Sequence, residues 1–455
     1  MTNRKTAAVI LAAGMGTRMK STLPKVMHPL AGRPMILNVL ETVGAMDPEE
    51  VVVVVGDEFG ELSETVAPYP VAVQKERLGT AHAVLKARDH LGDFDGDVFV
   101  LFGADPLIRP ETLDHMLDVR DSDADPAVVV LGFHAANPGA YGRLITTEDG
   151  ALEAIVEAKD ATPDQLDITL CNSGVMLIDG KVLFGLLDRI GNDNAKGEYY
   201  LTDIVALARG DGLSCAFVEG DEEELHGVDS RVDLAMAEMI MQDRLRTRAM
   251  ENGATLSDPG SVFFSFDTVL GTDVTVGPNV VFGPGVTVAE GAVINAFCHL
   301  EGAQVAAGAS VGPFARLRPG ASLGEGSKVG NFVEVKNAEL HSGAKVSHLS
   351  YIGDAEVGEG ANIGAGTITC NYDGFFKSKT VIGKGAFIGS NTALVAPVSV
   401  GDGAVIGAGS TIARDVEADA LAVTRADHRQ IAGWGKANRD KKNAQKEKQG
   451  NKKKD

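Results

Sequence analysis

The second half of the chain repeats an aliphatic residue followed by a small residue about every six positions. A hexapeptide repeat is typical of a parallel β-helix, in which one aliphatic side chain per short strand stacks into a continuous core and small residues fit the corners. Five-residue steps also occur, for example from Leu300 to Val305. The rhythm is clearest at Ile382-Gly383, Ile388-Gly389, Leu394, Val400-Gly401, Ile406-Gly407 and Ile412-Ala413.

The rhythm is interrupted between Ile363 and Ile382. The intervening residues 369–377, with the sequence TCNYDGFFK, must leave the coil as a loop. Loops carried on a rigid scaffold often hold functional residues. We therefore predict that this loop contributes to a site, with a loop of no function as the alternative.

The first part of the chain, up to about Ser230, alternates apolar runs with helical stretches. Residues 51–55, 98–102 and 128–131 are typical of buried strands, and residues 81–91 of a helix. Alternating units of this kind predict a mostly parallel sheet that binds ligands at the carboxyl ends of its strands.

A single long helix is predicted from Asp229 to about Met250, ending near Asn252-Gly253. We interpret this helix as a connector. The predicted organisation is therefore an α/β domain over residues 1–231, a helical linker over 232–252 and a β-helix domain over 253–455.

The first predicted strand runs into a glycine-bearing loop, so that residues 8–25 read AVILAAGMGTRMKSTLPK. Glycines let a backbone close around phosphate oxygens, and its N–H groups then act as anion donors. Arg18 and Lys25 would supply positive charge where a leaving pyrophosphate builds negative charge. The loop suits a nucleoside triphosphate, although it matches neither common phosphate-binding fingerprint. A secretory signal is disfavoured because the apolar run at 7–13 is short and charge follows it.

The 455 residues carry a formal net charge of −21, which argues against general nucleic-acid binding. The length predicts two or three domains. From Lys436 onward, nine basic residues face three acidic ones, and we expect a disordered, solvated tail, with a nucleic-acid or membrane contact as the alternative. No stretch approaches the roughly 20 apolar residues of a membrane span. Four scattered cysteines disfavour a disulfide framework or a zinc site and fit a reduced cytoplasm.

The opening residues resemble the L-A-A-G-x-G-T-R-M…P-K signature of sugar-nucleotide pyrophosphorylases. With the hexapeptide half and its loop, residues 5 to about 430 resemble the bacterial bifunctional N-acetylglucosamine-1-phosphate uridyltransferase and glucosamine-1-phosphate acetyltransferase family. The resemblance implies a Rossmann-like nucleotidyltransferase domain followed by a left-handed β-helix that forms a homotrimer. It also implies acetylation of glucosamine 1-phosphate by acetyl-CoA, then uridylyl transfer from UTP to give UDP-N-acetylglucosamine, a precursor of peptidoglycan and lipopolysaccharide.

The resemblance also implies a set of UTP and UDP-N-acetylglucosamine contacts in the first domain. Arg18 and Lys25 would bind phosphate and assist catalysis. The other residues implied are Leu11, Ala12, Ala13 and Gly14 in the phosphate loop, Gln74, Gly79 and Thr80 at uracil, Gly142, Glu157 and Asn172 at the sugar, and Gly103 and Asp229 nearby.

The expected magnesium site departs from the family pattern. The usual G-D-x-P reads Gly103-Ala104-Asp105-Pro106, and the usual asparagine of G-V-N is Asp229. A one-residue slip on a strand turns a side chain to the opposite face, although a rearrangement at the strand end could restore it. We expect Mg²⁺ at Asp105 and Asp229, because phosphoryl transfer needs charge neutralisation and carboxylates suit magnesium.

In the second domain the resemblance points to His348 as the general base that takes a proton from the substrate amine, a task that suits an imidazole. Arg318 and Lys336 would hold the sugar phosphate. Cys370 as an acyl-enzyme nucleophile is less favoured, because the family uses no cysteine nucleophile. The further residues implied are Tyr351, Asn362, Asn371, Tyr372 and Lys377 at the sugar, and Ala365, Ser390, Ala408 and Arg425 at acetyl-CoA.

Other interpretations stay open from the sequence. The β-helix could be purely structural in a nucleotidyltransferase, against which the set of Arg318, Lys336, His348 and Tyr351 argues. Alternatively, Ala104 could impair the metal site and leave a single-function acetyltransferase or a regulatory protein that binds nucleotide sugars.

Overall fold

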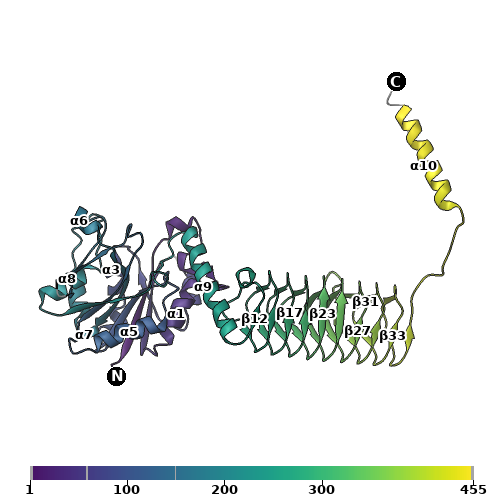
Figure 1. Ribbon diagram of the computed structural model, residues 1–455, viewed down its shortest axis with the longest axis horizontal. Helices are drawn as coiled ribbons and strands as arrows, with labels where there is room; N and C mark the ends of the chain where they lie inside the picture. Colours follow the sequence, from purple (N-terminus) through teal and green to yellow (C-terminus); the bar gives the residue numbers. More distant parts are fainter. Residues whose placement is uncertain (1–3, 58–59, 149, 452–455) are drawn as a thin grey trace. The chain divides into compact units, whose positions relative to one another are not determined.

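The computed structural model describes residues 4–57, 60–148 and 150–451, and the chain forms two compact units (Figure 1). The first unit ends at Val269 and also includes Val281–Val286. The second is made of Leu270–Val280 and the chain from Thr287 onward. The helix that we interpreted as a connector is therefore part of the first unit.

The first unit is built on a sheet with the strand order β11-β7-β10-β6-β1-β4-β5. Strand β1 pairs in parallel with β4 and β6, and β11 pairs in parallel with β7, as predicted. Strand β10 runs antiparallel to β6 and β7, and β8 pairs antiparallel with β9 and β10 at the side of the sheet. The bounds are β1 Thr6–Ala12, β4 Glu50–Gly56, β5 Val71–Gln74, β6 Asp97–Phe102, β7 Val128–His134, β8 Arg143–Thr146, β9 Leu152–Val156, β10 Leu170–Asp179 and β11 Cys215–Glu219.

Both faces of this sheet are buried, which explains the continuous apolar runs. In β1, Ala7 and Val9 belong to one core cluster, whereas Ala8 and Ile10 belong to the other. Helices supply the rest of each cluster. The first cluster includes residues of α3 (Thr80–Leu85), α7 (Gly180–Leu187) and α8 (Asp203–Gly210), and the second includes residues of α1 (Met35–Gly44), α2 (Gly60–Thr65) and α5 (Pro110–Arg120).

The helix predicted over residues 81–91 is in fact two short helices, α3 and α4 (Arg88–Leu91), separated by two residues. The remaining short elements of the first unit are η1 Thr17–Met19, η2 Lys25–Met27, β2 Pro29–Leu30, β3 Arg33–Pro34, α6 Pro163–Leu166, β12 Thr255–Leu256, η3 Pro259–Ser261 and β15 Val281–Phe282. Strand β13 (Val269–Leu270) lies where the two units join in the sequence.

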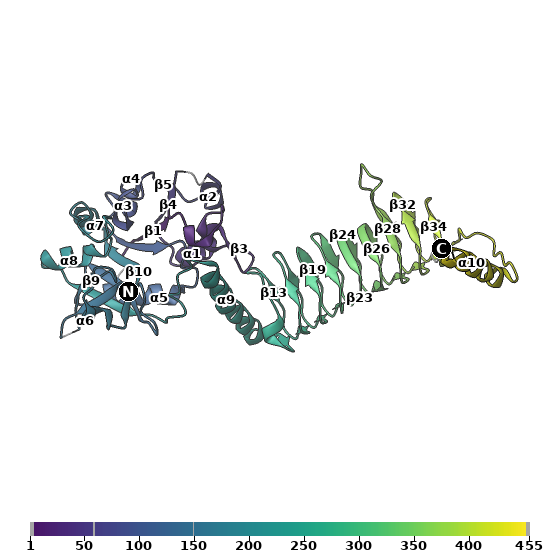
Figure 2. The same cartoon turned by 90° about the horizontal axis from the view of Figure 1, so that it is seen from above.

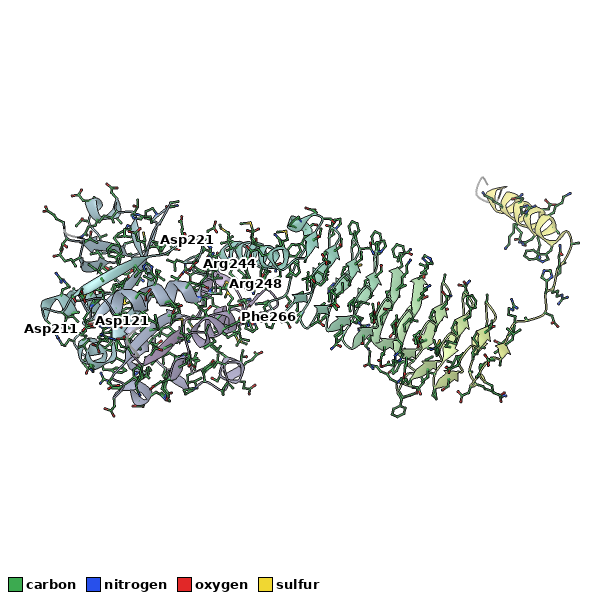
Figure 3. The ribbon with its side chains drawn as sticks, turned by 60° about the horizontal axis from the view of Figure 1, so that its bottom comes forward. Asp121, Asp211, Asp221, Arg244, Arg248 and Phe266 are labelled. Atoms are coloured by element: carbon green, nitrogen blue, oxygen red, sulfur yellow. The ribbon has the colours of Figure 1, made fainter. Side chains whose placement is uncertain are left out.

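The predicted long helix is confirmed as α9 (Arg231–Glu251). Ser230 caps it, since its hydroxyl accepts from the Asp233 amide while the Asp233 carboxylate accepts from the Ser230 amide. Arg244, marked in Figure 3, donates to the carbonyl of Leu107. Apolar side chains of the helix also pack against Leu30, Met35 and Leu107. These contacts fix the start of α9, and with it the residues just before it.

The second unit is a parallel β-helix, drawn as a stack of coils in Figures 1 and 2. In one ladder of strands, one buried aliphatic residue per coil pairs with its equivalents, through Val276, Ile294, Val311, Val329, Val346, Ile363, Ile388 and Ile406. These positions are 17 or 18 residues apart, except where the 371–379 loop adds length. The predicted stacked core is confirmed.

Two long ladders of strands form the coils, with shorter ones beside them. The first ladder contains β14 Thr275–Val276, β17 Val293–Ile294, β20 Ser310–Val311, β23 Lys328–Asn331, β25 Lys345–His348, β27 Asn362–Ile363, β30 Phe387–Ile388, β33 Val405–Ile406 and β35 Leu421–Ala422. The others are β16 Thr287–Val288, β18 His299–Leu300, β19 Ala303–Val305, β21 Arg316–Leu317, β22 Ala321–Leu323, β24 Glu334–Leu340, β26 Tyr351–Val357, β28 Ile368–Cys370, β29 Thr380–Ile382, β31 Ala393–Val395, β32 Val398–Val400 and β34 Thr411–Ile412.

The predicted loop is present between β28 and β29, but it runs over residues 371–379 and not 369–377, because Thr369 and Cys370 pair with Leu394 and Val395 as part of β28. Tyr372 and Lys377 pair across it, and Phe375 and Phe376 at its tip are exposed.

The basic C-terminal segment was expected to be disordered, and this expectation is wrong for the part that the structure describes. Residues Trp434–Asn451 form α10, with Trp434 exposed, whereas residues 452–455 lie outside the described residues. Lysine, arginine, alanine and glutamine are good helix formers, so a segment that cannot build a core can still form a helix. Within the described ranges, no helix is both long and apolar enough to cross a membrane.

Candidate active sites

The glycine-bearing loop after β1 is held by its neighbours. Gly16 has a φ of +59°, and a Cβ there would lie 2.6 Å from the Cβ of Lys25, so a larger residue would displace that lysine. Arg77 Nε donates to the carbonyl of Ala13 at 2.7 Å. Arg231 Nε, in the first turn of α9, donates to the carbonyl of Met19 at 3.2 Å. The loop expected to bind phosphate is therefore fixed at both ends.

Two basic side chains of this loop converge on one carboxylate. Lys25 Nζ lies 2.8 Å from Asp229 Oδ1, and Arg18 Nη2 lies 3.0 Å from Asp229 Oδ2. Asp229 directly precedes the cap of α9, which explains how a residue 204 positions away from Lys25 reaches the loop. The structure thus brings together three of the residues expected from the sequence.

Asp105 faces the same cluster. After β6 the chain turns, with the Asp105 amide donating to the Phe102 carbonyl at 3.1 Å, and Val228 N donates to Ala104 O at 2.9 Å. Ala104 consequently packs in the core, whereas Asp105 Oδ1 lies 3.0 Å from the place of a Cβ on Gly227. The turn at the end of β6 therefore directs Asp105 toward the cluster and Ala104 into the core. It offsets the one-residue shift of the aspartate relative to the family pattern.

The two carboxylates differ in their electrostatics. Burial raises the pKa of Asp105 to about 7. The negative charge of Asp229 also raises this pKa, whereas the positive charge of Lys25 lowers it. Burial also acts to raise the pKa of Asp229, but Lys25 and Arg18 outweigh it and hold that pKa below its usual value. Near neutral pH, Asp229 is ionised and Asp105 is close to its midpoint.

This donor set fits Mg²⁺. Magnesium is commonly held by one or two carboxylates together with substrate phosphates and water. Within the described residues, no group of three or more histidine, cysteine or acidic side chains gathers as a metal site. The remaining ligands would therefore come from a nucleotide and water.

The other residues expected at the nucleotide lie at the same edge of the sheet. Gln74 ends β5, and its Nε2 donates to Gly79 O at 3.1 Å. Gly79 has a φ of +120°, and a Cβ there would lie 2.4 Å from Tyr199 O. Thr80 Oγ1 accepts from Leu201 N at 2.9 Å. Gly103 N donates to Leu11 O at 3.0 Å, next to Ala12, Ala13 and Gly14.

The three residues expected at the sugar come from β8–β10 and the segments beside them. Asn172 N donates to Gly142 O at 2.8 Å, and a Cβ on Gly142 would approach Ile155 to 3.3 Å. Because β10 is antiparallel, its start lies beside the end of β7, at the ligand edge. Burial raises the pKa of Glu157, which accepts a hydrogen bond from Thr202.

In the second unit, His348 stands at the end of β25. Its Nδ1 lies 2.5 Å from Asn331 Oδ1, one coil earlier. Because a carbonyl oxygen only accepts, this pairing assigns the proton to Nδ1 and the basic lone pair to Nε2. The arrangement suits a general base.

Three basic side chains lie near one another on the β-helix. Arg318 Nη1 pairs with Glu334 Oε1 at 2.8 Å. Hydrogen bonding to Lys377 and the charge of that second ammonium lower the pKa of Lys336, with a smaller contribution from Arg318. Together these cations form a site suited to a phosphate.

Asp354 lies at the centre of this region. Its carboxylate accepts from Asn337 Nδ2 at 2.6 Å and from Asn371 Nδ2. Partial burial acts to raise the pKa of Asp354, but these hydrogen bonds and the nearby lysines hold it below its usual value. A groove of about 460 Å³ is lined by Asp354, Asn337, Lys377 and Ser322, among others.

The residues expected at acetyl-CoA occupy equivalent places on successive coils. Asn391 N donates to Ala365 O, and Gly409 N donates to Ser390 O, both at 2.8 Å. Asn362 starts β27, and Tyr351, which starts β26, pairs with Glu334. Tyr372 donates to Gly374 O within the loop. The resulting row runs along the β-helix through His348, Ala365, Ser390 and Ala408, and Arg425 lies on the next coil beside Gly409.

Sequence reasoning missed several residues that support these sites. Asn331, Glu334 and Asp354 stand 17 positions before His348, Tyr351 and Asn371. One coil of the β-helix has this length, so an offset of 17 from each expected residue could have found its partner. The sequence has no comparable signal for Arg77, which donates to the carbonyl of Ala13 from outside any repeat.

Comparison with known proteins bears on both units. Residues 8–162 match the family described as MobA-like NTP transferase domain, and residues 379–414 match six repeats of the bacterial transferase hexapeptide. The bifunctional protein GlmU of Paramagnetospirillum magneticum is 60% identical, over 98% of this chain and 100% of that protein. The chain belongs to the bifunctional GlmU family.

Further GlmU proteins agree along nearly the whole chain. The GlmU protein of Rhodospirillum rubrum is 65% identical over 94% of this chain and 96% of its own length. That of Cereibacter sphaeroides is 54% identical over 96% of each. This chain is therefore a bifunctional transferase with a Rossmann-like nucleotidyltransferase unit and a left-handed hexapeptide β-helix, and the single-function interpretations are not favoured.

Proposed function

We propose that the second unit acetylates glucosamine 1-phosphate with acetyl-CoA and that the first unit transfers a uridylyl group from UTP to the product. The observation that carries the proposal is the presence of a complete set of chemical groups in each unit. Lys25, Arg18, Asp229 and Asp105 converge in the first unit, and the His348–Asn331 pair belongs to the second.

In the uridylyl transfer, an oxygen of the sugar 1-phosphate attacks the α-phosphorus of UTP, and pyrophosphate leaves. Lys25 and Arg18 would neutralise the phosphates, and the backbone of the Gly14 loop would bind them. Asp105 and Asp229 would hold Mg²⁺, which supplies further charge neutralisation when bound. The remaining contacts proposed are Gln74, Gly79 and Thr80 for uracil, and Gly142, Glu157 and Asn172 for the sugar.

In the acetyl transfer, the sugar amine attacks the thioester carbonyl. His348 Nε2 takes the proton that the amine loses, and the coenzyme A thiolate leaves and is protonated. Arg318, Lys336 and Lys377 would hold the sugar phosphate, with Tyr351, Asn362, Asn371 and Tyr372 at the sugar. Coenzyme A would extend along the row of Ala365, Ser390 and Ala408, with Arg425 on a phosphate.

We further propose a homotrimer formed through the β-helix. Phe297, Phe314 and Phe332 stack along one corner with ring centroids 4.9 and 5.2 Å apart, and Leu349 continues the row. These four side chains are 46–62% exposed. A continuous exposed apolar stripe is typical of a protein interface. This stripe ends at Leu349, directly beside His348.

All four cysteines are unpaired, which supports a reducing cytoplasm.

The proposal is tested by assaying both half-reactions on one preparation. Pyrophosphate release from UTP and N-acetylglucosamine 1-phosphate reports the first unit, and coenzyme A release with glucosamine 1-phosphate reports the second. We expect Lys25→Ala to abolish only the first and His348→Ala only the second. Loss of both activities in either variant would contradict the assignment of one reaction to each unit.

A further inference from the structure

The two cations expected to bind the triphosphate are already engaged by one carboxylate. Each oxygen of Asp229 takes one of them, with Lys25 Nζ at 2.8 Å from Oδ1 and Arg18 Nη2 at 3.0 Å from Oδ2. The side chain of Lys25 is largely buried, whereas that of Asp229 is 41% exposed. An incoming phosphate would have to displace this carboxylate from both cations.

Asp229 is held firmly in this position. The amide beside it, Val228 N, donates to Ala104 O at 2.9 Å, and the next residue, Ser230, begins the capping box of α9. Asp229 N itself donates to Asp233 Oδ2 at 3.2 Å. The backbone therefore holds the Asp229 carboxylate in place, and only the cations that pair with this carboxylate can be exchanged.

The loop that carries the cations is held from the same helix. Arg231 Nε donates to Met19 O, next to Arg18, and a Cβ on Gly16 would press against Lys25. The first turn of α9 thus fixes both the carboxylate and the loop that carries the cations. Exchange of partners at Asp229 is consequently a local event that needs little movement of the backbone.

We propose that Asp229 is a gate that keeps Lys25 and Arg18 from phosphate until a divalent cation takes its carboxylate. A metal ion bound by Asp229 and Asp105 replaces the two side-chain cations and leaves them to bind phosphate. Metal binding therefore strengthens the binding of phosphate, and phosphate binding strengthens the binding of metal by the same factor. This inference rests on the proposed uridylyl transfer, and it adds an order: metal first, then full engagement of the phosphates.

The gate is tested on full-length protein without divalent metal, by calorimetric titration with inorganic pyrophosphate in the presence of a chelator. Asp229→Asn keeps the shape of the side chain and an oxygen for Lys25 but removes the charge. We expect this variant to bind pyrophosphate about tenfold more tightly than the wild type, a difference of about 1.4 kcal/mol. When Lys25→Gln and Arg18→Gln are added to Asp229→Asn, the gain should disappear.

Asp105→Asn is the matched control when the titrations are run at pH 8, because Asp105, with a pKa of about 7, then contributes negative charge to the same cluster without a direct ion pair to Lys25 or Arg18. An equal gain in both variants would mean a general field effect and would overturn the gate. No gain in Asp229→Asn would overturn it as well. Pyrophosphate release by the wild type with magnesium is measured in parallel, so that failure of the gate is distinguished from failure of the proposed function.

A second measurement needs no variant. Amine acylation followed by mass spectrometry reports the reactivity of Lys25 relative to the exposed Lys20 in the same loop. We expect excess magnesium chloride, at constant ionic strength, to raise the relative reactivity of Lys25 several-fold. Unchanged reactivity would show that the ion pair persists with metal, and the gate would be refuted even if Asp229→Asn did not fold.

Discussion

The pairing of His348 with Asn331 predicts a specific defect in acetyl transfer. The Nδ1···Oδ1 distance of 2.5 Å fixes both the ring orientation and the tautomer that leaves Nε2 basic. A hydrogen bond of this kind contributes about 0.5–1.5 kcal/mol net. Since about 1.4 kcal/mol corresponds to tenfold in rate, Asn331→Ala should lower kcat/KM for acetyl transfer about tenfold.

The chain offers its own control for this prediction. Uridylyl transfer depends on the other unit, so it should be unchanged in Asn331→Ala when both activities are measured on one sample. In a His348→Ala background, adding Asn331→Ala should have no further effect on the residual rate, because the residue acts through the histidine. A further tenfold loss in that background, or a parallel loss of both activities, would refute the positioning role.

Three more predictions follow from the geometry. Because burial raises the pKa of Asp105 to about 7, the native state binds more protons than the unfolded state between about pH 4 and 7, and stability falls as pH rises through that window. Metal-free Asp105→Asn should therefore be more stable than the wild type by about 2–4 kcal/mol at pH 8 and equal to it near pH 4, as measured by denaturant titration. Gly330→Ala would place a Cβ 1.9 Å from Ser347 O, so acetyl transfer should be lost while uridylyl transfer persists, whereas Gly185→Ala, with open space around its Cβ, should leave both rates unchanged. Phe332→Ser should shift the protein to smaller species in light scattering and lower acetyl transfer, and an unchanged mass would argue against the Phe297–Phe314–Phe332 stripe as the interface.

The sequence predicted the architecture well because both units depend on periodic burial. The apolar runs at 51–55, 98–102 and 128–131 are strands with two buried faces, and the hexapeptide aliphatics stack as expected. The antiparallel direction of β10 was not predicted, because the direction of a strand depends on the connections between strands and not on its composition. The helix in the tail from Lys436 was not predicted, because the composition of this segment shows only that it cannot form a core.

The candidate sites were less predictable, because they depend on turns and on neighbours distant in sequence. Whether Asp105 or Ala104 faces Asp229 is decided by the turn from Phe102 to Asp105 and by the hydrogen bond from Val228. Neither feature has a residue signature. The ion pairs of Asp229 were equally hidden, because Lys25 and Asp229 meet only through the docking of α9 on the first unit.

The stacked coils of the β-helix make the second unit sensitive to the register of its residues. Asn331 reaches His348, and Glu334 reaches Tyr351, because 17 residues separate the members of each pair, which is the length of the coil between them. Inserting one residue within β25, before His348, would turn the following side chains of that strand from the surface to the core or the reverse, whereas the corners already accommodate coils of 17 and of 18 residues. An added residue at the exposed tip of the 371–379 loop, at Phe375 and Phe376, leaves the stacked coils unchanged. In this unit, changes of length are therefore tolerated at the loop tip, at corners or as whole coils, and a one-residue shift within a strand that carries a site residue removes the site.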